Sequence, residues 1–186
     1  MLAGSRLRVI LVTTHIPFVQ VPGALSVERI CTTITLAAQH LAQFHALPQA
    51  RLAVAGLNPH AGEGGAFGDE EERIIRPAIE HARGQADRHR IRVDGPFPAD
   101  SVFVRAVEGE FDGVICLYHD QGLIPLKLLS WTDGVNVTIG LPIVRTSPDH
   151  GTAFDIAGQG KADPRSMQAA IRLAAQMTRH GQSSSS

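Results

Sequence analysis

Gly113–Tyr118 (GVICLY) is an apolar, β-branched run that ends directly before a histidine, His119. A short continuous run of this kind is typical of a strand that is buried on both faces of a sheet. Two upstream stretches follow the same pattern, Arg6–Thr14 (RLRVILVTT) and Arg51–Leu57 (RLAVAGL). Because strands buried on both faces occur in parallel sheets covered by helices, these stretches predict an α/β fold.

Helical patterns separate the strands. Ser26 is suited to cap a helix over Val27–His45, and the acidic run Asp69–Glu72 suits the positive end of a second helix that extends toward His81. Pro77 should kink or interrupt that second helix. Further elements are expected at Val93–Pro98 (extended), Ala99–Glu108 (helix), Val135–Ile139 (strand) and Pro164–Arg179 (helix). This alternation predicts α/β/α layers around a mostly parallel sheet.

The composition is that of an ordinary globular protein. Of the 186 residues, 44% are hydrophobic and 19% charged, and the formal net charge is -1, so nothing indicates a nucleic-acid or membrane partner. No apolar run approaches a membrane span, and no export signal precedes the first strand, so we expect a cytoplasmic protein. Cys31 and Cys116 fall in apolar patterns and are expected to be inert buried thiols. The tail Gly181–Ser186 is expected to be disordered.

Three histidines follow predicted strands: His15, His60 and His119. Ligands bind beyond the carboxyl ends of parallel strands, and three neutral imidazoles leave open positions on a divalent metal. A single histidine in such a place more often bonds a local backbone group. Spacing alone therefore leaves a metal site and three unrelated histidines equally open. Since the sequence holds no compact metal motif, a site would be assembled from distant segments.

Six segments resemble, in this order, the 4-hydroxythreonine-4-phosphate dehydrogenase family. They are TTHIP (Thr13–Pro17), GLNPHAGEGG (Gly56–Gly65), GPFPADS (Gly95–Ser101), YHDQGLIPLK (Tyr118–Lys127), GVNVTIGLPIVRTSPDHGTAFDIAG (Gly134–Gly158) and GKADPRS (Gly160–Ser166). The resemblance covers nearly the whole chain apart from the serine tail, with residues 1–180 matching the C-terminal portion of the family. It implies a fold similar to the isocitrate and isopropylmalate dehydrogenases.

The resemblance also implies roles for individual residues. His15, His60 and His119 match the family's metal ligands, and a divalent zinc, cobalt or magnesium ion is expected. The residues expected to contact substrate are Lys127, Asn136 and Arg145, and the candidates for proton transfer are Lys127, Asp100 and Asp120. Lysine and arginine suit a substrate that carries phosphate and carboxylate. Without the resemblance, Lys127 would be interpreted as a surface lysine and Asn136 as a turn residue. Arg145 would be interpreted as part of a surface ion pair, and Asp120 as the cap of the helix after His119.

Asp149–Gly158 (DHGTAFDIAG) resembles the adenosine-side loop of the isocitrate and isopropylmalate dehydrogenases, which implies NAD binding without a GxGxxG motif. The residues expected to bind the cofactor are Asp149, His150, Gly151, Thr152 and Asp155. The loop GEGGAFG (Gly62–Gly68) is either a flexible loop over the site or a direct phosphate contact.

The implied reaction is NAD-dependent oxidation and decarboxylation of 4-phosphooxy-L-threonine to 3-amino-2-oxopropyl phosphate, in pyridoxal phosphate (vitamin B6) biosynthesis. Two alternatives stay open: a 4-phospho-threonate or 4-phospho-erythronate dehydrogenase of sugar-acid catabolism, and a truncated, inactive paralogue. The family works as homodimers whose metal ligands come from both chains. Met1 falls at a point internal to the family pattern, so the resemblance implies that an upstream segment with further strands and a substrate-contacting His-Thr pair is absent.

Overall fold

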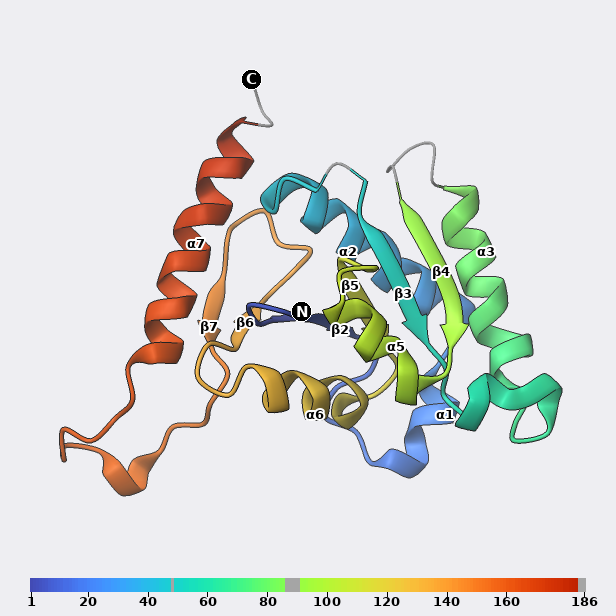
Figure 1. Cartoon of the computed structure of the whole chain (residues 1–186), viewed down its shortest axis with the longest axis horizontal. Helices are drawn as coiled ribbons and strands as arrows, with labels where there is room; N and C mark the ends of the chain where they lie inside the picture. Colours follow the sequence, from blue (N-terminus) through green and yellow to red (C-terminus); the bar gives the residue numbers. More distant parts are fainter. Residues whose placement is uncertain (48, 86–90, 184–186) are drawn as a thin grey trace.

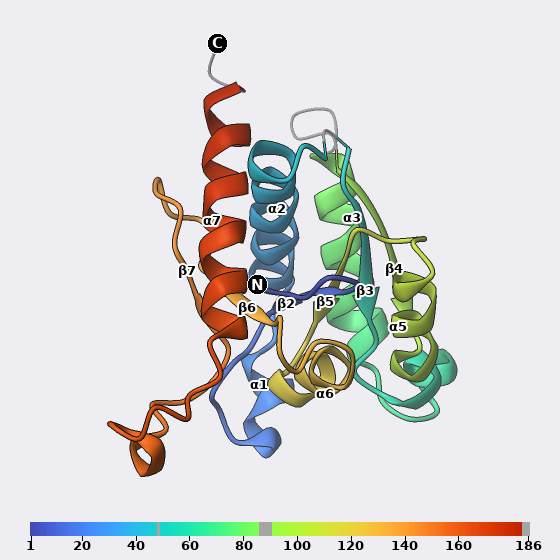
Figure 2. The same cartoon turned by 60° about the vertical axis from the view of Figure 1, so that its left-hand side comes forward.

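The computed structural model describes residues 1–47, 49–85 and 91–183, which form a seven-stranded sheet between helices (Figures 1 and 2). The order across the sheet is β4-β3-β5-β2-β1-β6-β7. The strands are β1 (Leu2–Ala3), β2 (Arg8–Leu11), β3 (Arg51–Ala55), β4 (Arg92–Phe97), β5 (Gly113–Cys116), β6 (Val135–Val137) and β7 (Thr146–Pro148).

Four neighbouring strands, β4, β3, β5 and β2, are paired in parallel. β1 is antiparallel to both β2 and β6, and β7 is antiparallel to β6. All strands except β1 and β7 therefore point the same way, which confirms the predicted mostly parallel sheet. The loops after β2, β3, β4 and β5 consequently leave the sheet at the same edge.

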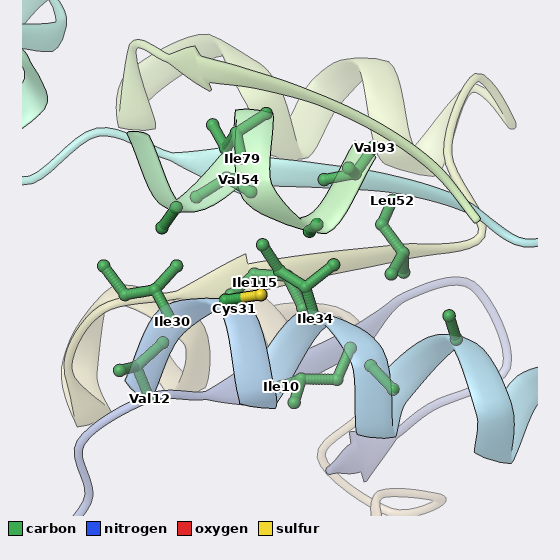
Figure 3. Packing of buried hydrophobic residues seen from close by; sticks show 14 of the residues in the cluster. Ile10, Val12, Ile30, Cys31, Ile34, Leu52, Val54, Ile79, Val93 and Ile115 are labelled. Carbon is green, nitrogen blue, oxygen red and sulfur yellow. The ribbon is translucent and has the colours of Figure 1, made fainter. Parts of the chain in front are cut away.

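Helices cover both faces of the sheet, as predicted. One face packs Ile10, Val54 and Ile115 against α2 (Val27–Phe44) and α3 (Arg76–Gly84) (Figure 3). The opposite face packs alternate residues of the same strands against two other helices, α5 (Ala99–Val107) and α6 (His119–Leu129). Each such side chain that is fully buried contributes about 1.5–3 kcal/mol to folding. This double-sided burial is why β5 is apolar throughout and why β2 and β3 are apolar after their first residue.

The predicted helices form close to their expected bounds. The Ser26 hydroxyl accepts a hydrogen bond from the amide of Arg29 at 3.1 Å and caps α2, as predicted. The last helix, α7 (Arg165–Ser183), packs against β6 and β7 and extends beyond the predicted end at Arg179. Residues 184–186 of the serine tail lie outside the described residues.

The second predicted helix changes type along its length. It begins as a π-helical segment, η3 (Glu71–Ile75), and becomes α-helical in α3 at Arg76. Pro77 stands at the second position of α3, directly after the π-helical segment. The helical run from Glu71 to Gly84 is unbroken, so the predicted interruption appears only as a change of helix type next to Pro77.

The antiparallel half of the sheet differs from the prediction. The strand expected over Val135–Ile139 forms only over Val135–Val137, and its two partners, β1 and β7, were not predicted. Both are only two or three residues long, too short for a hydrophobic period to show.

The other general expectations concern membranes and thiols. Within the described part of the chain, no helix has the length and apolar character needed to cross a bilayer. Cys31 and Cys116 are free and buried, and burial raises the pKa of both thiols, as expected of inert cysteines.

Candidate metal and substrate site

Two of the three predicted metal ligands lie side by side at the carboxyl edge of the sheet. The ring centroids of His15 and His119 are 5.3 Å apart. The segments that carry them are joined at the strand ends, because the Thr13 amide and hydroxyl both donate to the carbonyl of Leu117, at 3.2 and 2.7 Å. Thr13 is only 4% exposed, so this join is shielded from water.

Asp120 fixes the orientation of the His119 ring. Its Oδ1 lies 2.7 Å from Nδ1 of His119. When Nδ1 carries the proton and donates it to this carboxylate, Nε2 presents a lone pair for a metal. The donor chemistry of the pair therefore fits a divalent ion, although two imidazoles do not complete a site.

A cavity of about 280 Å³ adjoins the histidine pair, lined by Thr14, His15, Ile16, Phe18, Val21, Tyr118, His119 and Asp120. Its lining includes Tyr118, whose ring packs edge-on against that of Phe18 with 5.2 Å between the ring centroids. Burial, together with the neighbouring Asp120 carboxylate, raises the pKa of Tyr118. The phenol therefore stays protonated at neutral pH and can act as a hydrogen-bond donor.

His60 lies apart from the other two histidines. It stands in the turn η2 (Pro59–Gly65), whose residues 60 to 64 have positive φ, and its ring is 6.0 Å from that of Phe67. Among the described residues, no group of three His, Cys, Asp or Glu side chains is arranged to hold a metal. The structure thus pairs His15 with His119 and does not add His60 to them within this chain.

A second, larger cavity of about 500 Å³ lies between α6 and the loops around α7, lined by Lys127, Ser130, Trp131, Thr132, Asp149, His150, Gly151, Ala153, Ile156, Ala162, Asp163 and Ser166. Nζ of Lys127 lies 3.2 Å from Oδ2 of Asp149. The same ammonium is 5.6 Å from the centroid of the Trp131 ring. A cation, carboxylates and an aromatic face thus line one opening, a combination suited to a polar aromatic ligand.

The predicted cofactor and substrate residues divide around this larger cavity. Asp149, His150 and Gly151 line it, together with Lys127, whereas Thr152 and Asp155 do not. Asn136 lies on β6 with an exposed side chain. Arg145 is exposed just before β7, and its Nη1 donates to Oγ1 of Thr138 at 2.7 Å.

The two cavities share no lining residue. Within this chain, therefore, Lys127, Asn136 and Arg145 do not surround one cavity with the histidine pair. Asp100 lies exposed in the first turn of α5, at the carboxyl edge that also carries the histidines, and lines neither cavity.

Comparison with known proteins decides the family. The model of the family described as pyridoxal phosphate biosynthetic protein PdxA matches residues 1–174. This chain belongs to the PdxA family. A 4-hydroxythreonine-4-phosphate dehydrogenase of Desulfosudis oleivorans is 60% identical over 174 residues, covering 94% of this chain and 51% of that protein. A Salmonella typhi relative, provisionally named D-threonate 4-phosphate dehydrogenase, is 52% identical over 173 residues, covering 93% and 51%.

Solved structures agree with this assignment. The crystal structure of a Klebsiella pneumoniae 4-hydroxythreonine-4-phosphate dehydrogenase superposes with a TM-score of 0.85 at 48% identity, covering 95% of this chain and 52% of that chain. An isocitrate dehydrogenase of Methylococcus capsulatus has the same fold, with a TM-score of 0.52 at 19% identity and coverage of 84% and 43%. This PdxA-family chain spans about half the length of the curated relatives it matches.

Two buried polar residues of this PdxA-family chain were not predicted as site residues. Gln121 is 6% exposed and bonds both the Leu117 amide and the Gly56 carbonyl, each at 2.7 Å. Glu71 is 1% exposed and bonds the loop before His60. The sequence placed Glu71 at a helix start, as the structure does, but gave no sign of its hydrogen bonds to residues 57 and 58. Gln121 carried no signal beyond its place in YHDQG.

Proposed function

We propose that this chain supplies the metal-binding and cofactor-binding half of a 4-hydroxythreonine-4-phosphate dehydrogenase. The reaction is oxidation of 4-phosphooxy-L-threonine with NAD and loss of carbon dioxide, giving 3-amino-2-oxopropyl phosphate. The observation that carries this proposal is the pairing of His15 with His119 at the carboxyl edge of a sheet that belongs to the PdxA family. Family membership alone would not distinguish a working site from a lost one.

His15 and His119 would hold a divalent ion, with His60 of a second copy as a further ligand. The separation of His60 from the pair in one chain supports a site shared by two chains of a homodimer. When bound, such an ion supplies Lewis acidity that eases deprotonation of the substrate hydroxyl. Asp120 would keep the His119 ring in the tautomer that leaves Nε2 free.

The charged side chains would bind the substrate's two anionic groups and move protons. Lys127 and Arg145 provide cations for phosphate and carboxylate, and Asn136 provides an amide for the remaining polar atoms. Asp149 holds the Lys127 ammonium at the mouth of the larger cavity, where Lys127 would also serve proton transfer. Asp100 and Asp120 are the other candidates for that transfer.

NAD would occupy the larger cavity. His150 and Gly151 line it beside Asp149, and Trp131 gives it an aromatic wall. Carboxylates such as Asp149 can accept hydrogen bonds from ribose hydroxyls. Thr152 and Asp155 follow in the same loop, and we assign them to the cofactor on the resemblance of the segment alone.

A second substrate, D-threonate 4-phosphate, is favoured by one observation. The Salmonella typhi relative provisionally named for it is 52% identical, little below the 60% of the first relative. The two substrates differ in the group on one carbon, which bears an amine in 4-phosphooxy-L-threonine and a hydroxyl in D-threonate 4-phosphate. The same phosphate and metal contacts would therefore serve both.

NADH formation tests the proposal. We would compare the 186-residue chain with a chimera in which the upstream half of the Desulfosudis oleivorans relative precedes it, each with 4-phosphooxy-L-threonine and with D-threonate 4-phosphate. The proposal predicts turnover of 4-phosphooxy-L-threonine by the chimera. Turnover of D-threonate 4-phosphate alone would support the second substrate, and turnover of neither by a folded chimera would contradict both.

A further inference from the structure

The loop that carries His60 is anchored on one buried carboxylate, that of Glu71. Oε1 of Glu71 accepts hydrogen bonds from the amides of Leu57 and Asn58, both at 2.7 Å. Oε2 accepts a third from Nδ2 of Asn58 at 2.9 Å. Glu71 is 1% exposed, so its charge is compensated by these N–H groups, and no ion pair of the described residues includes it.

The backbone above this carboxylate is strained. Residues 60 to 64 all have positive φ, including three that are not glycine: His60 at 52°, Ala61 at 52° and Glu63 at 42°. A non-glycine residue in this left-handed region costs roughly 1–2 kcal/mol. Such a conformation persists only where the surrounding structure holds it, and such strain is concentrated at functional sites.

Close packing ties the strained turn to Glu71. A Cβ added at Gly62 would lie 2.8 Å from Oε2 of Glu71, so the turn passes directly over the carboxylate. A Cβ added at Gly56 would lie 3.0 Å from Cα of Ala61. Glu71 itself stands at the start of the π-helical segment, whose wider turn is of a kind found frequently at functional sites.

We propose that Glu71 is a positioning residue that sets the direction of His60 toward its metal. This inference rests on the proposed function, in which His60 is a metal ligand. For this role, both carboxylate oxygens of Glu71 must accept hydrogen bonds from the loop. In Glu71→Gln, one oxygen becomes an NH₂ group that faces either two backbone N–H groups or the amide of Asn58, so one anchor is lost whichever way the amide turns.

The positioning role of Glu71 is tested by the Zn²⁺ affinity of the full chain. The affinity is measured by competition with a chromophoric chelator. Groups that orient metal ligands typically contribute 10–100-fold in affinity, so Glu71→Gln should weaken Zn²⁺ binding by about that factor. Glu70→Gln is the matched control, because Glu70 also accepts from Nδ2 of Asn58, at 2.7 Å, but from neither backbone amide. It should change the affinity by less than about threefold.

A double-mutant cycle separates positioning from general loss of structure. If Glu71 acts through His60, then Glu71→Gln should weaken Zn²⁺ binding no further in a His60→Ala background. An equal loss in both backgrounds would overturn the proposal. If Glu71→Gln fails to fold, the same cycle is run with Glu71→Asp, which keeps the charge but withdraws it by one methylene, and the same non-additivity is expected.

The cycle also distinguishes this proposal from the function on which it rests. If His60→Ala weakens Zn²⁺ binding while Glu71→Gln matches the Glu70→Gln control, only the positioning role of Glu71 is refuted. If His60→Ala leaves Zn²⁺ binding unchanged, the ligand role of His60 is refuted, and the role of Glu71 falls with it.

Discussion

Nε2 of Gln121 donates a 2.7 Å hydrogen bond to the carbonyl of Gly56 and so links the segments after two neighbouring parallel strands. One segment carries His119 and the other carries His60. Because Oε1 of the same amide accepts from the Leu117 amide, both ends of the side chain are used. Gln121→Leu would leave a buried N–H and a buried carbonyl unpaired.

We therefore predict that Gln121→Leu lowers the free energy of unfolding by roughly 2–6 kcal/mol, at about 1–3 kcal/mol for each unpaired group. Urea unfolding followed by circular dichroism measures it. Gln168→Leu, at an exposed position on α7, is the control and should shift stability by less than about 0.5 kcal/mol. Equal effects of the two substitutions would show that the hydrogen bonds of Gln121 do not stabilise the fold.

Arg145→Met should raise KM for the phosphorylated substrate in the chimera while changing kcat little. The expected increase is about 10–100-fold, because a hydrogen bond to a charged group contributes roughly 1.5–3 kcal/mol. Steady-state kinetics with the substrate varied at saturating NAD gives the result. Arg172→Met, at an exposed arginine of α7, should leave KM unchanged. An unchanged KM in an active Arg145→Met enzyme would refute the substrate role of Arg145.

Stability should fall in mild acid because of His40. This side chain is 6% exposed on α2, and burial lowers its pKa from 6.5 to about 4. Between these two values the unfolded chain binds more protons than the folded chain. The contribution of neutral His40 to the free energy of unfolding is therefore fully present above pH 6.5 and is lost as the pH falls toward 4.

The largest loss from His40 is about 3–4 kcal/mol, at roughly 1.4 kcal/mol for each pKa unit. Burial lowers the pKa of the neighbouring His45 to about 4 as well. His40→Leu should therefore reduce, by about half, the slope of unfolding free energy against pH across this window, as measured by urea unfolding at several pH values. His81→Leu, at an exposed histidine of α3, should keep the slope of the parent chain. A parent slope that persists in His40→Leu would show that other groups carry it.

The 186-residue chain should self-associate when isolated, with little or no dehydrogenase turnover. Large apolar side chains are exposed on several elements, among them Val19 (84%), Phe154 (83%), Leu128 (82%) and Trp131 (76%). Apolar surface of this extent favours association. Light scattering should report a dimer or larger species. A monodisperse monomer with normal NAD reduction would contradict the prediction.

The parallel half of the fold could be predicted from sequence because its strands are apolar at consecutive positions, as Gly113–Cys116 is. Helix α2 could be predicted from its cap and its apolar period, as Ser26 shows, whereas α6, with Pro125 inside it, was not among the elements predicted from such patterns. The antiparallel half could not, because β1 and β7 are held by pairing with strands distant in sequence rather than by a local pattern.

The site was predicted less completely. Strand ends and the family resemblance pointed to His15 and His119, which do lie together. The loop that carries His60 has six consecutive positive φ angles, at residues 60 to 65, a conformation that residue types alone do not disclose. The roles of Glu71 and Gln121 arise from contacts across 14 and 65 residues of sequence, which no local pattern encodes.

Zinc content tests the central claim most directly. The chain would be incubated with Zn²⁺, desalted and analysed for metal by mass spectrometry, beside His15→Ala, His119→Ala and the surface control His81→Ala. We predict about one zinc ion per chain for the parent and the control, and well under half of that for each of the other two variants. No bound zinc in the folded parent, or equal zinc in all four proteins, would contradict the metal site that His15 and His119 are proposed to form.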